Sequence, residues 1–233
     1  MKALQRTTIG IIGAGNMGQA LLRGLLLAGV SPRRVVVVDT NPATRRLLQQ
    51  RYRIRSSPMD RLATCDVIVI AVKPHEVTNL LSGLRRLLAR GRKRIVLISI
   101  AAGLKTRALE RALGRCAVVR VMPNLAATAG EAISAVTPGR WATASDVRLA
   151  TAIFQCVGEV VPLPERLFDV VTAISGSGPA YFFLIFQALR DAGIRAGVPA
   201  ALAQRLAVRT ALGSARLVNG STETLETLMA RVA

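Results

Sequence analysis

The sequence predicts an α/β domain with a mostly parallel sheet and helices on both of its faces, followed by an all-helical segment. Two observations lead to this prediction. Short continuous runs of Val and Ile, typical of strands buried on both faces of a parallel sheet, alternate with helix-like segments through the first two-thirds of the chain. After Pro162 the strand patterns stop and only helical patterns follow.

Each strand of the expected sheet is a short apolar run. In chain order these runs occupy residues 8–12, 35–39, 66–72, 95–100, 117–121, 132–136 and, as a short closing strand, 158–161. The intervals between the first five runs have helical patterns, at residues 16–28, 43–51, 76–90 and 105–113. This alternation is typical of strand-helix-strand units.

The last part of the chain has only helical patterns, at residues 165–173, 179–196 and 199–219. It is too short and too apolar to fold as an independent globule, and residues 182–186 (FFLIF) put apolar groups all round one helix. We therefore expect two domains, residues 1–161 and 162–233, of which the second joins copies of the chain into a homodimer or higher homo-oligomer.

Charge is distributed unevenly along the chain. The net charge is +19, and residues 1–120 carry 23 of the 32 lysines and arginines but only five of the 13 acids, a net +18. This half suggests an anionic partner, although dispersed arginines are also typical of a solvated surface. The aromatic side chains that single-strand binders use for base stacking are scarce, so nucleic acid is not the expected partner.

Cysteine usage and hydropathy indicate the compartment. Cys65, Cys116 and Cys156 are odd in number and widely spaced, which favours reduced thiols and argues against a disulfide framework or a metal site. The first residues are polar and show no signal peptide, and no run approaches the roughly 18 apolar residues of a membrane span. We expect a cytoplasmic protein without membrane contact.

A glycine motif identifies the first domain as a candidate nucleotide-binding domain. Gly13-x-Gly15-x-x-Gly18 follows the first strand and opens the first helix. In such a loop the first glycine turns the chain, the second admits a pyrophosphate and the third lets the helix approach the sheet. Residues 1–161 are thus predicted to be a dinucleotide-binding, Rossmann-like domain whose phosphate loop comprises Gly13, Ala14, Gly15, Asn16, Met17 and Gly18.

Two further positions bear on the nucleotide. Asp39 ends the second strand, where a carboxylate can hold ribose hydroxyls, which favours NADH; Arg45 and Arg46 lie close by and can meet a 2′-phosphate, so NADPH remains open. Asp39 can equally be a helix N-terminal acid. Residues at the end of the third strand lie at the carboxyl edge of the sheet and are candidate cofactor contacts, namely Ala71, Val72, Lys73 and Pro74.

Five segments in this order resemble pyrroline-5-carboxylate reductase, a family of proline biosynthesis. They are IGIIGAGNMGQAL, AVKPHEV, ISIAAGL, RVMPNLAATAGEA and FDVVTAISGSGPAYFFLIFQALRDAGIRAGVP, and they cover residues 8 to about 218. The resemblance implies a Rossmann domain with a helical dimerisation domain, an NADPH or NADH cofactor, and hydride transfer to the cyclic imine 1-pyrroline-5-carboxylate. It also implies cofactor contacts from Ala101, Ala102, Gly103 and Asn124.

On this resemblance, the SGSGP stretch holds the substrate at the start of a helix. Free amides and the helix dipole suit the single carboxylate of the imine. Ser175 and Ser177 are the candidate catalytic residues, and either Glu165 or Asp169, which precede the stretch, is expected to favour the protonated imine. The expected substrate contacts are Gly176, Ser177, Gly178, Pro179 and Glu165.

Two alternatives stay open. The family's SPGGTT-like loop does not occur before Ala233, so a weakly active or non-catalytic nucleotide-binding relative is possible. A β-hydroxyacid or 6-phosphogluconate-type dehydrogenase shares the glycine motif, but that chemistry needs a lysine after the second glycine-rich loop. No lysine follows Lys105, which argues against this second alternative.

Overall fold

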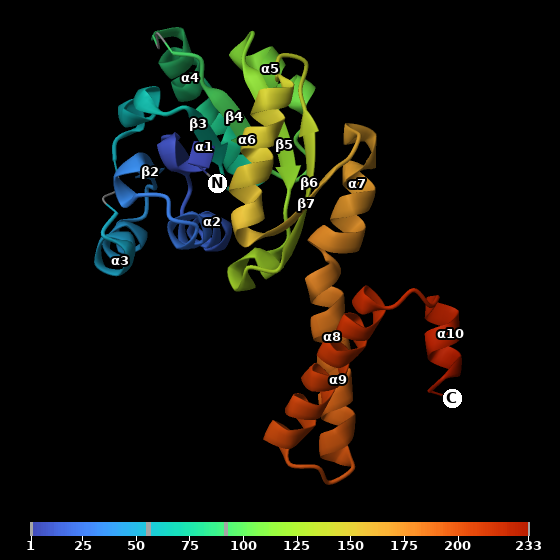
Figure 1. The fold of residues 1–233 in the computed structure, drawn as a ribbon. Coiled ribbons are helices and arrows are strands. Elements are labelled where there is room, and N and C mark those ends of the chain that lie inside the picture. Colours follow the sequence, from blue (N-terminus) through green and yellow to red (C-terminus); the bar gives the residue numbers. More distant parts are fainter. Residues whose placement is uncertain (1, 55–56, 91–92, 233) are drawn as a thin grey trace. The chain divides into compact units, whose positions relative to one another are not determined.

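A computed structural model describes residues 2–54, 57–90 and 93–232 of the chain (Figure 1). One seven-stranded sheet has the strand order β2-β1-β3-β4-β5-β6-β7. The strands are β1 (Ile9–Ile12), β2 (Val35–Val38), β3 (Val67–Ile70), β4 (Val96–Ser99), β5 (Ala117–Met122), β6 (Ala132–Pro138) and β7 (Gly158–Pro162). All neighbouring pairs are parallel except β5 and β6, which confirms the predicted fold class.

Helices cover both faces of this sheet. One face packs residues of β1, β2 and β5 against apolar residues of α1 (Lys2–Arg6), α2 (Asn16–Leu27), α3 (Pro42–Tyr52) and α6 (Ala144–Phe154). The other face, which includes Ile68 and Leu97, packs against α4 (Pro74–Arg90) and α5 (Thr106–Leu113). The strands bury side chains on both faces, which explains why they read as continuous apolar runs in the sequence.

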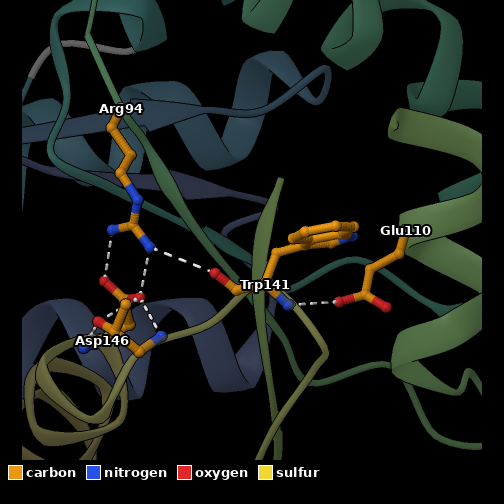
Figure 2. Close-up of polar contacts among 5 residues, drawn as sticks. Arg94, Glu110, Trp141 and Asp146 are labelled. Carbon is orange, nitrogen blue, oxygen red and sulfur yellow. Dashed lines mark hydrogen bonds and ion pairs between the residues drawn. The ribbon is translucent and has the colours of Figure 1, made fainter. Parts of the chain in front are cut away.

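Helix α6 was missing from the sequence-based expectation, although its start is encoded locally. The Thr143 hydroxyl accepts a hydrogen bond from the Asp146 amide, and the Asp146 carboxylate accepts one from the Thr143 amide, which is a capping box. Both carboxylate oxygens of Asp146 also accept from Arg94, at 2.7 and 2.6 Å (Figure 2). Arg94 lies just before β4, so this pair ties the sheet to α6.

The same region holds a solvent-facing tryptophan. The Trp141 backbone carbonyl accepts from Arg94 and its amide donates to Glu110 (Figure 2). Its ring lies 5.2 Å from the Arg115 guanidinium and 5.1 Å from that of Arg140. The loop before α6 is therefore held by polar contacts to α5 and by cation–π contacts.

The helical part begins with one continuous helical run from Glu165 to Arg195. It comprises a 3-10 turn (Glu165–Leu167), α7 (Phe168–Val171), a π-helical turn (Thr172–Gly176) and α8 (Gly178–Arg195); α9 (Ala200–Gly220) and α10 (Leu225–Ala230) follow. The predicted helices are thus present, but the first two are joined and α10 was not expected.

The backbone divides into two compact units, Met1–Gly178 and Pro179–Ala233. The first part of the helical run therefore belongs with the sheet, because Phe168 is buried in a small cluster with Met122 and Ala135. The functional division at residue 161 stays a prediction.

Within the second unit, α8 and α9 contact each other through small residues. A Cβ built on Gly193 would lie 3.1 Å from the Cβ of Ala203, and Ala203 and Ala207 are buried. Most large apolar side chains of the unit remain exposed, including Tyr181, Phe182, Phe183, Leu184, Ile185, Leu189, Leu202, Leu206 and Leu217. The expectation of an apolar surface all round α8 is confirmed.

One sequence-based expectation on hydropathy was wrong. Residues 170–189 carry no charge, and the run Glu165–Arg195 is long and apolar enough to cross a membrane by length and composition alone. The expectation was wrong because Gly, Ser and Pro at residues 175–179 predicted a break between two shorter helices, whereas the structure has one continuous helical run. A helix of this kind also serves as an interface between protein chains, where its apolar face is buried by a partner.

We predict that Asp146 contributes stability with a defined pH dependence. The hydrogen bonds from Arg94 lower the pKa of the Asp146 carboxyl from 3.8 to about 2. Because the folded pKa lies below the unfolded value, the contribution is present above pH 3.8 and is lost as the pH falls toward 2. Asp146→Asn should lower the free energy of unfolding at pH 7 by about 1–2 kcal/mol.

Urea denaturation of the wild type and of Asp146→Asn at pH 7, 4 and 3 measures this contribution. The difference between the two proteins should shrink at pH 3. Asp169→Asn is the control, because Asp169 is exposed and its carboxylate has no hydrogen bond to a described residue. A difference that is constant with pH would contradict the assignment.

Candidate functional site

A cavity of about 890 Å³ lies at the carboxyl edge of the parallel strands. Its walls come from the loops that follow β1, β2, β3 and β5 and from the first turns of α2 and α4. The strand order changes direction at β1, which lies between β2 and β3, and open α/β sheets bind their ligands at such a switch point. The volume is that of a site for a cofactor-sized molecule.

The glycine loop forms one wall and has the geometry that the motif predicts. Gly13 has a φ of +90°, and a Cβ there would lie 2.7 Å from the Val72 side chain. A Cβ on Gly18 would overlap the carbonyl oxygen of Gly13, so only glycine lets α2 start this close to the loop. A Cβ on Gly15 would meet no atom within 4 Å, and Gly15 lines the cavity, which leaves room for a phosphate.

Asp39 lies in the cavity wall, and its carboxylate is already hydrogen-bonded. Its Oδ2 atom accepts from the Ala14 amide and its Oδ1 atom accepts from the Asn41 amide, both at 2.7 Å. The carboxylate therefore braces the glycine loop against the end of β2. Its position agrees with the sequence-based expectation, and its role as a ribose ligand stays a prediction.

The opposite wall comes from the loops after β3 and β4. Ala71, Val72, Lys73 and Pro74 line the cavity, and the Lys73 amide donates to the Glu76 carboxylate at 3.0 Å, which closes the first turn of α4. Among residues 101–103, Ala102 lines the cavity, whereas Ala101 is buried beneath it and Gly103 lies outside the lining.

The far end of the cavity is formed by Met122, Asn124 and Gly176. A Cβ on Gly176 would lie 2.8 Å from the Cε atom of Met122, so the helical run and the end of β5 are in close contact here. The Oδ1 atom of Asn124 is buried and has no hydrogen-bond partner among the described residues. An unpaired acceptor at this place fits a ligand that donates a hydrogen bond.

The SGSGP stretch differs from the expectation of a free helix start. The Ser177 amide donates to the Thr172 carbonyl at 2.8 Å, five residues back, and the Ser175 hydroxyl donates to the Val171 carbonyl at 3.0 Å. The stretch is therefore a π-bulge within a continuous helix, where the Ser177 amide is not free. Gly176 lines the cavity, whereas Ser175, Ser177, Gly178 and Pro179 do not.

Glu165 lies away from the cavity lining. Its Oε1 atom accepts from the Thr106 amide at 2.8 Å and from Arg120 at 3.2 Å, and its Oε2 atom accepts from the Thr106 hydroxyl at 2.9 Å. Through Thr106 of α5 and Arg120 of β5, the Glu165 carboxylate connects both elements to the start of the helical run. No local sequence pattern indicates these partners, because they lie 45 and 59 positions away from Glu165.

Several lining residues were not predicted from the sequence. Most of them are close in sequence to a predicted contact, whereas Met59 comes from a separate 3-10 helix; they are Thr40, Asn41, Thr44, Met59, Glu76, Asn79, Leu80, Ile100 and Leu125. Thr40 and Asn41 could have been predicted from the sequence, because they directly follow Asp39 at the end of a strand, where ligands of open α/β sheets bind.

The three cysteines are unlike catalytic nucleophiles. All are unpaired, and burial raises the pKa of the Cys65 and Cys116 thiols to about 11. Burial also raises the pKa of Cys156. At neutral pH these thiols are protonated, so they lack the thiolate that nucleophilic chemistry requires.

Comparison with known proteins identifies the family. A family model described as pyrroline-5-carboxylate reductase dimerisation matches residues 165–233, and one described as NADP oxidoreductase, coenzyme F420-dependent, matches residues 8–103. Pyrroline-5-carboxylate reductase of Synechocystis is 38% identical over 218 residues, which are 92% of this chain and 80% of the relative. The chain belongs to the pyrroline-5-carboxylate reductase family. The enzyme of Methanosarcina acetivorans is 39% identical over the same shares of the two chains.

Solved structures of pyrroline-5-carboxylate reductases have the same fold. The enzyme of Coxiella burnetii superposes with a TM-score of 0.88 at 29% identity and covers 97% of this chain and 85% of its own. The Plasmodium falciparum enzyme, solved with NADP bound, gives a TM-score of 0.86 at 28% identity, with coverage of 98% and 85%. The dimerisation model covers the exposed apolar helices, so in this family a second copy, rather than a lipid bilayer, accounts for them.

We predict that Asp39→Asn weakens NADH and NADPH alike. The substitution removes the charge that holds the Ala14 amide, and the glycine loop serves both nucleotides. Loss of a charged hydrogen bond corresponds to about tenfold in each dissociation constant. Fluorescence titration with each nucleotide measures the effect, with Glu159→Gln, an exposed acid on β7, as the control.

The two roles of Asp39 give opposite results. If Asp39 mainly held the ribose hydroxyls, NADH would weaken and NADPH would bind as in the wild type. That outcome would contradict the bracing role.

Proposed function

We propose that the protein reduces 1-pyrroline-5-carboxylate to L-proline with NADPH or NADH, as the names of its relatives indicate. One observation carries the proposal. A single cavity joins a glycine-loop cradle, formed by Gly13 and Gly15, to a wall formed by Gly176 of the SGSGP stretch. A nucleotide and a small ring can thus share one cavity.

The cradle fits a nicotinamide nucleotide. A Cβ on Gly15 would meet no atom within 4 Å, α2 starts close to the loop at Gly18, and Asn16 and Met17 of the first turn of α2 line the cavity. At the other end, the unpaired Oδ1 atom of Asn124 can accept from a carboxamide. When bound, the dihydronicotinamide supplies a hydride to the carbon of the C=N bond.

The chain itself has to position the imine and provide a proton for its nitrogen. Gly176 presents no side chain, so a flat ring can approach the cavity wall there. The two serines beside it differ: Ser175 donates its hydroxyl hydrogen to Val171, whereas the Ser177 hydroxyl makes no hydrogen bond to a described residue. Of the two serines, Ser177 is therefore the candidate hydrogen-bond donor at this end, although Gly176 alone of this stretch lines the cavity.

The proposal extends to assembly and location. The exposed apolar side chains of α8 and α9 form the contact between copies in a homo-oligomer, within the region of the dimerisation model. The relatives are soluble enzymes, which supports a soluble protein, and we place it in the cytoplasm as part of this proposal. The net charge of the first 120 residues favours anionic small molecules in this setting.

The first prediction on activity concerns Gly176. The wild type should oxidise NADPH or NADH only when the imine is present, with formation of proline. Gly176→Ala places a methyl group 2.8 Å from Met122 Cε and pushes that side chain into the cavity. The value of kcat/KM for the imine should fall about tenfold while nucleotide affinity stays unchanged.

Met122→Ala is the matched control, because it removes the Cε atom with which the new methyl group would clash. In the Met122→Ala background, Gly176→Ala should lower kcat/KM for the imine by less than about twofold. An equal loss in both backgrounds would refute the contact, and a wild type without imine-dependent oxidation of either nucleotide would refute the proposed function.

The second prediction concerns self-association. Phe183 of α8 is 55% exposed in the isolated chain, and Phe183→Glu puts a charge into the expected interface. Sedimentation should show a dimer or larger assembly for the wild type and dissociation for the variant. Leu27→Glu is the control, because Leu27 is 81% exposed on the sheet unit. A wild-type monomer, or equal behaviour of both variants, would contradict this interface.

A further inference from the structure

Arg120 is a charged residue in the middle of a buried strand. It lies in β5, whose sequence is AVVRVM and whose six residues are all buried. Only 1% of Arg120 is exposed, which makes it one of the largest fully buried side chains of the protein. A guanidinium is costly to bury, so its contacts need an explanation.

Two groups of the helical run face this guanidinium. The Nη1 atom donates to Glu165 Oε1 at 3.2 Å, and the guanidinium carbon lies 4.7 Å from the centre of the Phe168 ring. Glu165 is fixed in turn by the amide and hydroxyl of Thr106 at the start of α5. The Nη2 atom is buried and has no partner among the described residues.

The contacts continue from Phe168 to the cavity. Phe168 is fully buried and packs with Met122, which lines the cavity. The Phe168 carbonyl accepts from the Thr172 hydroxyl at 2.7 Å, at the start of the π-bulge. The bulge ends at Gly176, which lines the cavity next to Met122. Arg120 therefore contacts Phe168, which in turn contacts both the start of the bulge and Met122.

Stability alone does not account for this arrangement. A buried ion pair contributes little net stability once desolvation is counted, and an apolar side chain of similar size often replaces it without loss. Here one donor of the guanidinium is also unsatisfied, which adds a cost. The planar, forked guanidinium does fix direction, because it holds a carboxylate and a ring at set positions at once.

We propose that Arg120 is a positioning residue for the imine end of the cavity, acting through Glu165 and Phe168 on the π-bulge that presents Gly176. This inference deepens the proposed function and rests on it for the identity of the substrate. Arg120 is not among the described residues that line the cavity. Its loss should therefore affect the imine and leave nucleotide binding intact.

The test compares Arg120→Met and Arg120→Lys with the wild type. Arg120→Met keeps the length of the side chain without its charge, and Arg120→Lys keeps the charge but loses the planar contact with Phe168. The control is Arg94→Met, which removes another arginine–carboxylate pair, at a site outside the cavity lining. Two readouts are measured: hydrogen exchange of segments 168–178 and 8–18, and steady-state kinetics with the imine and each nucleotide.

In Arg120→Met, exchange of segment 168–178 should be faster and that of segment 8–18 unchanged. The value of kcat/KM for the imine should fall by about 10- to 100-fold, with the nucleotide dissociation constant within about twofold of the wild type. Arg120→Lys should give exchange rates and a kcat/KM between those of the wild type and Arg120→Met. If Arg120→Met does not fold, Arg120→Lys is the variant that tests the proposal. Arg94→Met should leave segment 168–178 and the kinetics unchanged.

Two results would overturn the proposal. Unchanged exchange of segment 168–178 in both Arg120 variants would show that Arg120 does not hold the bulge. Equal acceleration of segments 168–178 and 8–18 would show a general loss of stability instead of positioning. The exchange readout does not depend on activity, so a wild type that fails to reduce the imine would refute the proposed function and leave this test standing.

Discussion

The parallel pairing of β1 with both β2 and β3 is the constraint on which the site depends. In-register pairing ends the three strands at one edge, so the loops after Ile12, Val38 and Ile70 start side by side. The Gly13 amide then donates to the Val38 carbonyl, and Asp39 reaches back to Ala14. The glycine loop is thus fixed from two strands at once, and its open side faces the cavity.

The other end of the cavity depends on a helix that is continuous but irregular. The π-bulge at Thr172–Gly176 widens the helical run where it meets β5, and side-chain hydroxyls of Thr172 and Ser175 occupy backbone carbonyls of the preceding turn. π-bulges are rare in proteins, and those that occur often lie at functional sites. The bulge brings Gly176 to the cavity while α8 continues into the apolar helical unit. One helical run therefore contributes both to the cavity wall and to the region matched by the dimerisation model.

Much of this architecture was predictable from the sequence, because local signals and global packing agree. The seven strands read as Val/Ile runs since both faces of the sheet are covered, and Gly13 and Gly18 stand where steric crowding excludes any other residue. Other features have no local signal. The partners of Glu165 and Arg120 come from distant segments, and the bulge cannot be distinguished from a helix start by Gly and Pro alone. Helix α6 had a signal, Thr143 and Asp146 in a capping box, that the hydropathy pattern obscured.

The central claim is that nucleotide and imine meet in one cavity between the glycine loop and the bulge. A crystal structure of the protein with NADP⁺ and L-proline, the product of the proposed reaction, tests it most directly. The claim predicts the pyrophosphate at Gly15, the nicotinamide near Asn124 and the proline ring against Gly176. Proline bound elsewhere, or a nicotinamide that points away from Gly176, would contradict it.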